Sequence, residues 1–277
     1  KKKINLSPWK NVTKIVTDKN LKVINIAIVG KYVDLKDAYK SLDEALVHGG
    51  IKNNVKIKII RIESDKLKIS EIRKKLIDAS GILIPGGFGK RGTEGKIACI
   101  NYARKNNIPF LGICFGMQMA VIEFARNVLK IKKAGSSELD KKCFSVVGLI
   151  EEWSKNGKIV KGTSTKLGGT MRLGLYTAKL QHNSKIKDIY KSKIIHERHR
   201  HRYEVNIKMK KKFEKKGMLF SGLSPDNNLP EIIELKNHPW FIGVQFHPEF
   251  KSRPLDPHPL FSSFISAAKK NNEKSNN

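Results

Sequence analysis

The chain has 277 residues, with 55 Lys or Arg against 25 Asp or Glu and a formal net charge of +30. Hydrophobic residues make up 39% and aromatic residues 8%, which suffices for a packed core and excludes wholesale disorder. The excess charge is mostly lysine interleaved with Asn and Ile, without a basic block, a zinc-finger spacing or an aromatic RNA-binding motif. We interpret it as the charge of a biased, solvated surface, and a nucleic-acid partner is the less favoured alternative.

The cysteines and the apolar segments predict a cytoplasmic protein without membrane contact. Cys99, Cys114 and Cys143 are odd in number and lack paired spacing, so a disulfide scaffold is not expected. The longest charge-free stretch, 106–122, contains a proline and two glycines and is too short to span a bilayer. The N-terminal KKKINLSPWK has no apolar segment typical of a secretory signal, and the lack of an initiator Met indicates a piece of a longer protein.

The first half of the chain alternates predicted strands and helices. Strands are expected at 24–30, 55–62, 81–87 and 108–114, and helices at 37–48, 70–79, 94–105 and 115–126. Repeated β-α-β units with short connections predict an α/β fold, a three-layer, mostly parallel sheet with helices on both faces. The alternating VKIKIIRI is expected at an edge of that sheet. Ligands bind such sheets beyond the carboxyl ends of the strands, where the PGG and GIC segments lie.

The second half is less regular. Five segments are predicted as strands: SVVGLIEEW, TMRLGLYTAKL, LFSGL, EIIELK and FIGVQFHPEF. Helices are expected near 207–216 and 259–270, and the polar, glycine-containing stretch 136–169 is expected to include loops.

Cys114 is the central residue of Gly112-Ile-Cys-Phe-Gly116, the Gly-x-nucleophile-x-Gly pattern of a strand-to-helix turn. The glycines leave room for a sharp turn that exposes the central side chain, and the following helix N-terminus favours thiolate over thiol. The alternative is a small buried hydrophobic cysteine, which is what most free cysteines are. This pattern alone leaves both interpretations open.

A candidate base follows the last predicted strand, in QFHPEF at 245–250. Pro248 ends the strand after His247, and Glu249 is close enough in sequence to bond one imidazole nitrogen. A thiol nucleophile needs a base, and the base needs a group that fixes its tautomer and orientation. Cys114, His247 and Glu249 supply these three groups. Taken alone, the motif favours a structural histidine at a strand end beside a solvated glutamate.

The third signal is PGGFG at 85–89. Consecutive glycines after a strand let backbone N–H groups point into a pocket without obstruction by a Cβ. A thiol that hydrolyses amides needs donors aimed at the developing oxyanion, and the N–H groups of Gly87 and Phe115 are the candidates. A tight turn without a ligand is the alternative for Gly-Gly alone. Three signals at three strand ends reinforce one another.

Together, PGGFG, GICFGMQ and QFHPE resemble the class I glutamine amidotransferases, which hydrolyse glutamine through a Cys-His-Glu triad. Four longer strings resemble the amidotransferase domain of the CTP synthase family: DAYKSLDEALVHGG (37–50), GGTMRLG (168–174), ERHRHRYEVN (197–206) and NHPWF (237–241). The similarity covers roughly residues 6–268 and implies a flavodoxin-like member of the α/β class.

The resemblance implies roles for individual residues. Cys114 would attack the side-chain amide of L-glutamine and form a thioester, His247 would protonate the departing ammonia and then activate water, and Glu249 would orient His247. Glutamine binding and the oxyanion hole are implied for Gly87, Phe115, Gly116, Met117, Gln118, Glu138 and Arg202. The charges of two of these side chains agree with glutamine binding. The Glu138 carboxylate suits the substrate's α-ammonium, and the Arg202 guanidinium can bind its α-carboxylate in a bidentate manner.

A metal site is the alternative for the histidine-rich HERHRH segment. His196, His199 and His201 are the candidate ligands, but the interleaved arginines disfavour a cation and no carboxylate cluster accompanies them. We therefore expect no metal in this chain. Cys99 in a helical pattern and Cys143 in a loop have no visible base and are expected to be structural.

The resemblance also implies a larger enzyme. In CTP synthases an N-terminal synthetase domain uses ATP to phosphorylate UTP, and ammonia from the amidotransferase domain then gives CTP. No G-x-x-x-x-G-K-[ST] loop occurs in this chain, so we expect no cofactor here and place the ATP, UTP and Mg²⁺ sites on the synthetase domain. GTP is implied as an allosteric activator, acting by analogy near GGTMRLG and Phe88.

The implied division of the chain is a linker from the synthetase domain at 1–20, an amidotransferase domain at 21–270 and a disordered tail at 271–277. The implied full-length assembly is a homotetramer. Two alternatives remain. One is a stand-alone γ-glutamyl hydrolase or another class I amidotransferase subunit, against which ERHRHRYEVN argues. The other is a basic nucleic-acid-binding module with a degenerate catalytic fold.

Overall fold

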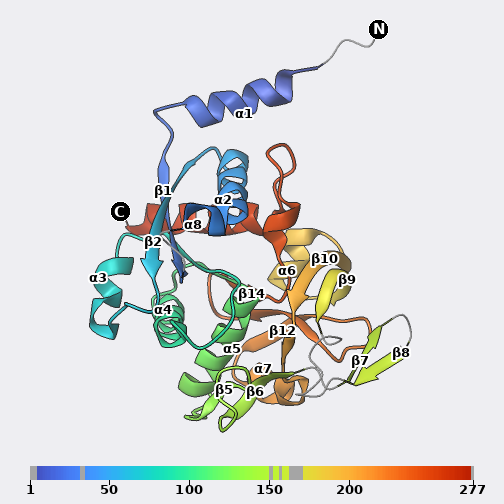
Figure 1. Cartoon of the computed structure of the whole chain (residues 1–277). Coiled ribbons are helices and arrows are strands. Elements are labelled where there is room, and N and C mark those ends of the chain that lie inside the picture. Colours follow the sequence, from blue (N-terminus) through green and yellow to red (C-terminus); the bar gives the residue numbers. More distant parts are fainter. Residues whose placement is uncertain (1–4, 32–34, 150–151, 156–157, 162–170, 276–277) are drawn as a thin grey trace.

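A nine-stranded sheet forms the centre of the protein, seen in a computed structural model that describes residues 5–31, 35–149, 152–155, 158–161 and 171–275 (Figure 1). The strand order is β10-β9-β12-β13-β14-β4-β3-β1-β2. The bounds are β1 (Val23–Gly30), β2 (Lys56–Glu63), β3 (Gly81–Ile84), β4 (Phe110–Ile113), β9 (Arg172–Leu180), β10 (Ile194–His201), β12 (Met218–Leu223), β13 (Pro230–Leu235) and β14 (Phe241–Val244).

The sheet has a parallel and an antiparallel half. Strands β2, β1, β3, β4 and β14 run parallel, and β13, β12, β9 and β10 continue the sheet with antiparallel pairing. Strands β3 and β4 are short, apolar and fully buried, as expected of parallel strands covered on both faces. Strand β2 lies at the edge of the sheet, as its alternating sequence predicts. The predicted α/β class is confirmed, and the sheet is mixed because the second half of the chain adds antiparallel strands.

Helices cover both faces of the sheet, so that two hydrophobic cores lie on either side of it (Figure 1). On β1, Ile24, Ile26 and Ile28 belong to the core under α2 (Lys40–Lys52) and α8 (Pro259–Ser275). The intervening Ala27 and Val29 belong to the core under α3 (Ile72–Leu76), α4 (Thr93–Lys105) and α5 (Phe115–Asn127). The period of two along the strand produces this division.

Smaller elements surround the three layers. They are α1 (Ser7–Thr17), α6 (Lys185–Tyr190), α7 (Lys210–Lys215), the sheet of β5 (Ala134–Ser136), β6 (Phe144–Leu149) and β11 (Tyr203–Val205), and the hairpin of β7 (Glu152–Lys155) and β8 (Lys158–Lys161). Helix α1 lies apart from the sheet, within the stretch predicted as a linker, and only its Ile15 is buried (Figure 1). No helix in the described ranges has the length and apolar character needed to cross a membrane.

Several predicted elements differ from the observed ones. The helix expected at 70–79 is only α3, preceded by a 3-10 turn at Ile69–Glu71. Helix α8 continues to Ser275, which corrects the tail predicted at 271–277 for all but the last two residues, which are outside the described ranges. The extension is held because the side chains of Asn271 and Asn272 donate hydrogen bonds to Ser80. Residues 168–170 of GGTMRLG lie outside the described residues.

A buried ion cluster ties the large sheet to the small one. The Arg172 guanidinium in β9 donates to Glu204 of β11 at 2.8 Å and to Glu231 of β13 at 2.7 Å. Two carboxylates thus share one cation. Burial raises the pKa of Glu204 to about 8, with Arg172 opposing the shift and the Glu231 carboxylate adding to it. Glu204 therefore keeps its proton to a higher pH in the folded protein than an exposed glutamate does.

This cluster predicts a pH-dependent stability. Because the folded pKa of Glu204 lies above its ordinary value of 4.5, the folded state retains a proton that the unfolded state loses between these two values. The contribution of Glu204 to the free energy of unfolding should then decrease as pH rises from 5 to 8. Glu204→Gln cannot ionise, so it should lose less stability over that range, as measured by urea unfolding at several pH values. Glu71→Gln, at an exposed ion pair, is the control and should follow the wild-type dependence. An identical pH dependence in Glu204→Gln would contradict the assignment.

Candidate active site

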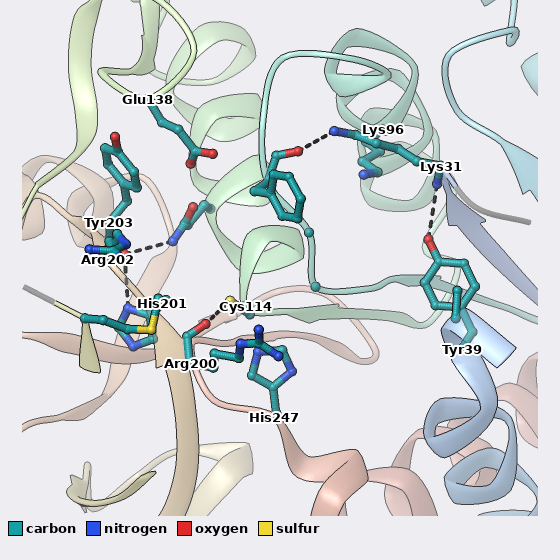
Figure 2. A pocket seen from close by; sticks show the side chains of 16 residues that line it. Lys31, Tyr39, Lys96, Cys114, Glu138, Arg200, His201, Arg202, Tyr203 and His247 are labelled. Carbon is teal, nitrogen blue, oxygen red and sulfur yellow. Dashed lines mark hydrogen bonds between the residues drawn. The ribbon is translucent and has the colours of Figure 1, made fainter. Parts of the chain in front are cut away.

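Three loops meet at the carboxyl edge of the parallel half of the sheet. Strands β3, β4 and β14 are neighbours, and the Gly86–Gly87 turn, Cys114 and His247 follow them in that order. All three contribute to the walls of a cavity of about 720 Å³ (Figure 2). The three sequence signals are therefore brought into one site, at the edge where parallel sheets bind ligands.

Cys114 occupies a strained turn between β4 and α5. Its backbone has φ +50° and ψ −102°, unusual for a residue with a side chain, and its N–H donates to the Val244 carbonyl at 2.7 Å. A Cβ on Gly116 would collide with the Ile84 carbonyl oxygen, and a Cβ on Gly112 would lie 2.8 Å from the Gly116 carbonyl carbon. The flanking glycines thus permit the close approach that the turn requires. The Cys114 side chain is nearly buried but lines the cavity.

His247 is held by Glu249 and lies near Cys114 in the cavity wall. Its Nδ1 lies 2.8 Å from Glu249 Oε1, which fixes the tautomer with the proton on Nδ1. Its Nε2 is buried and has no partner in standard hydrogen-bond geometry among the described residues. Burial lowers the pKa of His247, but the nearby Cys114 thiol and the Glu249 carboxylate outweigh burial and raise that pKa to about 10. At neutral pH His247 therefore holds its proton beside the Cys114 sulfur.

The cavity wall also carries charged side chains that can bind the charged groups of an amino acid. Glu138 accepts a hydrogen bond from the Gly89 N–H at 2.7 Å, so its carboxylate is tied to the end of the PGGFG turn. Figure 2 shows Glu138, Arg202 and Tyr203 on one side of Cys114, and Lys31 and Lys96 on the other. The site therefore presents a carboxylate and a guanidinium near the nucleophile.

The structure brings most, but not all, of the predicted site residues into the cavity wall. The wall includes Gly87, Cys114, Gln118, Glu138, Arg202 and His247. Glu249 contacts His247 from behind. Phe115, Gly116 and Met117 are buried in the first turn of α5 outside the wall. Of these three, Phe115 can contribute its backbone N–H, because the first N–H groups of a helix have no intrahelical acceptor.

The HERHRH segment lies in strand β10, and its three histidines do not come together as one cluster. Along the strand, His199 and His201 point inward and are buried, while His196 lies on the exposed face. His199 Nδ1 and His201 Nε2 lie 2.9 Å apart in a direct hydrogen bond. Burial and then the Arg172 charge lower the pKa of both histidines, which stay neutral. Within the described ranges, no three His, Cys, Asp or Glu side chains come together as a possible metal site.

Two lysines of the cavity wall were not predicted. Lys31 Nζ donates to the carbonyls of Phe88 and Gly89 and so holds the PGGFG turn. Lys96 is 1% exposed, with Nζ 5.0 Å from the centre of the Phe115 ring, and burial and the Lys31 charge lower its pKa to about 7. The sequence held signals for both. Lys31 directly follows a predicted strand, and Lys96 falls on the apolar stripe of its helix.

A comparison with protein families matches residues 34–267 to the class I glutamine amidotransferase family. This match covers most of the chain. The chain belongs to the class I glutamine amidotransferases.

Individual relatives narrow this class. The chain is 74% identical over 269 residues to the CTP synthase of Pelagibacter ubique and 53% identical over 266 residues to that of Rhodospirillum rubrum, covering 97% and 96% of its own length. It spans about half of these relatives, 50% and 49%. The solved glutaminase domain of Trypanosoma brucei CTPS with bound acivicin superposes with a TM-score of 0.81 at 39% identity. That comparison covers 89% of this chain and 94% of the other, so within the class the chain falls among the CTP synthase glutaminase domains.

The close approach at Gly116 predicts a large effect of one methyl group. Gly116→Ala should lower the free energy of unfolding by about 3 kcal/mol, because the new Cβ meets backbone atoms of Ile84 that cannot move aside. Gly87→Ala is the matched control, since a Cβ there meets nothing closer than 3.8 Å, and its effect should stay within about 1 kcal/mol. Urea unfolding monitored by circular dichroism measures both. Equal effects of the two substitutions would refute the packing argument.

Proposed function

We propose that this chain hydrolyses L-glutamine to glutamate and ammonia through a thioester on Cys114. The observation that carries the proposal is the state of His247, with Nδ1 held by Glu249 and its pKa raised to about 10 beside a cysteine on a strained turn. A histidine of this kind keeps a proton available on Nε2 and supports the thiolate form of its neighbour. His199 and His201, which are buried in β10, have lowered pKa values and therefore hold no such proton at neutral pH.

In the first half of the reaction, the Cys114 sulfur forms a bond to the carboxamide carbon of glutamine. The carbonyl oxygen becomes an oxyanion, which the N–H groups of Gly87 and Phe115 would stabilise. His247 then gives its Nε2 proton to the amide nitrogen, the C–N bond breaks, and ammonia leaves. The products of this half are the glutamyl thioester and a neutral imidazole.

In the second half, neutral His247 accepts a proton from water as that water attacks the thioester carbon. The C–S bond breaks, the thiolate re-forms beside the imidazolium, and glutamate is released. Glu249 keeps its hydrogen bond to Nδ1 throughout and holds the imidazole in place. Each turnover consumes one glutamine and one water and restores the enzyme.

Substrate orientation is assigned to the two charged groups on the far side of the cavity. Glu138 would bind the α-ammonium of glutamine and Arg202 its α-carboxylate. Because Glu138 also accepts the Gly89 N–H, substrate binding and the oxyanion turn share a support. This assignment fits an amino acid substrate better than a neutral amide.

The larger role proposed for the chain follows from its relatives. Its relatives are CTP synthases of about twice its length. Their names support a role in which ammonia from this chain is delivered to a synthetase portion, where ATP, UTP and Mg²⁺ are used to form CTP. GTP activation and a homotetramer belong to the same proposal. We place the reaction in the cytoplasm, where a reducing environment keeps the Cys114 thiol available.

Replacing the nucleophile tests the proposal. Cys114→Ala should lower glutamate release by at least about a thousandfold, because no other group can form the thioester. Cys143→Ala is the control, since that thiol lies outside the cavity, and it should keep wild-type activity. Glutamate is measured in the protein that carries this chain, with and without GTP. Undiminished hydrolysis by Cys114→Ala would exclude the mechanism.

A further inference from the structure

Within the part of the chain that the structure describes, two groups besides His247 lie near the Cys114 sulfur, and they have opposite effects on it. The Arg200 carbonyl oxygen lies 3.9 Å from Sγ and can accept the thiol proton (Figure 2). Gln245 Nε2 lies 3.7 Å from Sγ and donates to it. A carbonyl favours the neutral thiol, whereas an N–H donor favours the thiolate. The Gln245 donor therefore offsets the effect of this carbonyl and adds to the stabilisation that His247 gives the charged sulfur.

The orientation of the Gln245 carboxamide is set by its neighbours. A carboxamide has an oxygen that accepts hydrogen bonds and a nitrogen that donates them. A fixed partner for one of these atoms therefore determines the direction in which the other points. The Tyr203 backbone carbonyl can only accept, and Gln118 Nε2 donates to it at 2.9 Å. The same Gln118 nitrogen lies 3.2 Å from Gln245 Oε1. With its oxygen directed at Gln118, Gln245 must direct its Nε2 hydrogens at the sulfur.

Helices and strands hold the hydrogen-bonded chain from the Tyr203 carbonyl through Gln118 and Gln245 to the Cys114 sulfur. Gln118 lies in the first turn of α5, and its backbone N–H bonds to the Cys114 carbonyl at 3.2 Å. Gln245 follows β14, is fully buried, and donates its backbone N–H to the Glu231 carbonyl at 2.8 Å. Tyr203 begins β11, which pairs with β6. Neither carboxamide can rotate without leaving a buried polar group without a partner.

We propose that Gln245 is a catalytic residue of this site: its Nε2–H donates to the Cys114 sulfur and stabilises the thiolate, in an orientation imposed by Gln118 and the Tyr203 carbonyl. The inference rests on the proposed function, in which Cys114 is the nucleophile. It extends that function, because the triad alone assigns no role to Gln245. It also links the nucleophile to Tyr203, the residue that follows the proposed carboxylate ligand Arg202.

The reactivity of the sulfur tests this role without an assay of turnover. Gln245→Met keeps the length of the side chain and removes both its donor and its acceptor. Alkylation of Cys114 by iodoacetamide, followed by peptide mass spectrometry across pH, reports the thiolate. In Gln245→Met the midpoint of this profile should move to higher pH by about one unit, which is about a tenfold slower alkylation below the midpoint. Gln181→Met, at an exposed glutamine, is the matched control and should leave the profile unchanged.

The other two cysteines provide internal controls in the same samples. Cys143 lies outside the cavity and should keep its wild-type profile. Cys99 is buried in α4, and burial raises its pKa to about 12, so new alkylation there would report loosened packing. A Cys114 profile that does not move, with Cys99 still protected, would overturn the proposal.

A measurement on the wild-type protein decides the case in which Gln245→Met loosens the fold. The chain has three glutamines, so ¹⁵N-glutamine labelling gives three pairs of side-chain amide signals. The Gln245 amide protons should shift with the midpoint of Cys114 alkylation, and those of exposed Gln181 should not. Gln245 amide signals that do not change across the Cys114 alkylation midpoint would refute the hydrogen bond from Gln245 to the sulfur. Glutamine hydrolysis is scored separately, so a shifted profile in a protein without glutaminase activity would refute the proposed function alone.

Discussion

The site depends on the turn at Cys114, because this turn decides whether the sulfur faces the cavity or the core. A side chain is held at φ +50° only where the surrounding structure fixes the backbone on both sides. Strand β14 does so through the Val244 carbonyl, and α5 does so by packing the glycine face of its first turn against the end of β3. The strain is therefore supported by the parallel half of the sheet. The site could not be transferred to a loop without that support.

Histidines that lie near one another in this protein have opposite pKa shifts. In β10, burial and the Arg172 charge keep His199 and His201 neutral, and they serve as hydrogen-bonding parts of the core. His247 is also buried, but a carboxylate on one nitrogen and a thiol near the other reverse the direction of its pKa shift. Local partners, not burial alone, thus separate a structural histidine from one that can transfer protons. The buried Arg172 cluster contributes to this separation by placing its charge under β10.

Much of the parallel half could be predicted from the sequence, because its buried strands are mostly apolar, and β1, β3 and β4 have glycines at or near their ends. The convergence of Cys114 and His247 followed from the rule that such ends share one edge. Features that depend on contacts distant in sequence were missed. Strand β10 alternates charged and histidine residues, so its buried face is apparent only with Arg172 from β9 in place. The end of α8 depends on Ser80, and the orientation of Gln245 on two other segments.

If Cys114 carries the glutamyl group, mass spectrometry of protein mixed with L-glutamine and quenched in acid during the first turnovers should detect it directly. We expect a mass increase of one glutamyl group on the peptide that contains Cys114, which disappears as the glutamine is exhausted. Glutamate release accompanied by an adduct on another residue, or by no adduct at any quench time, would contradict it.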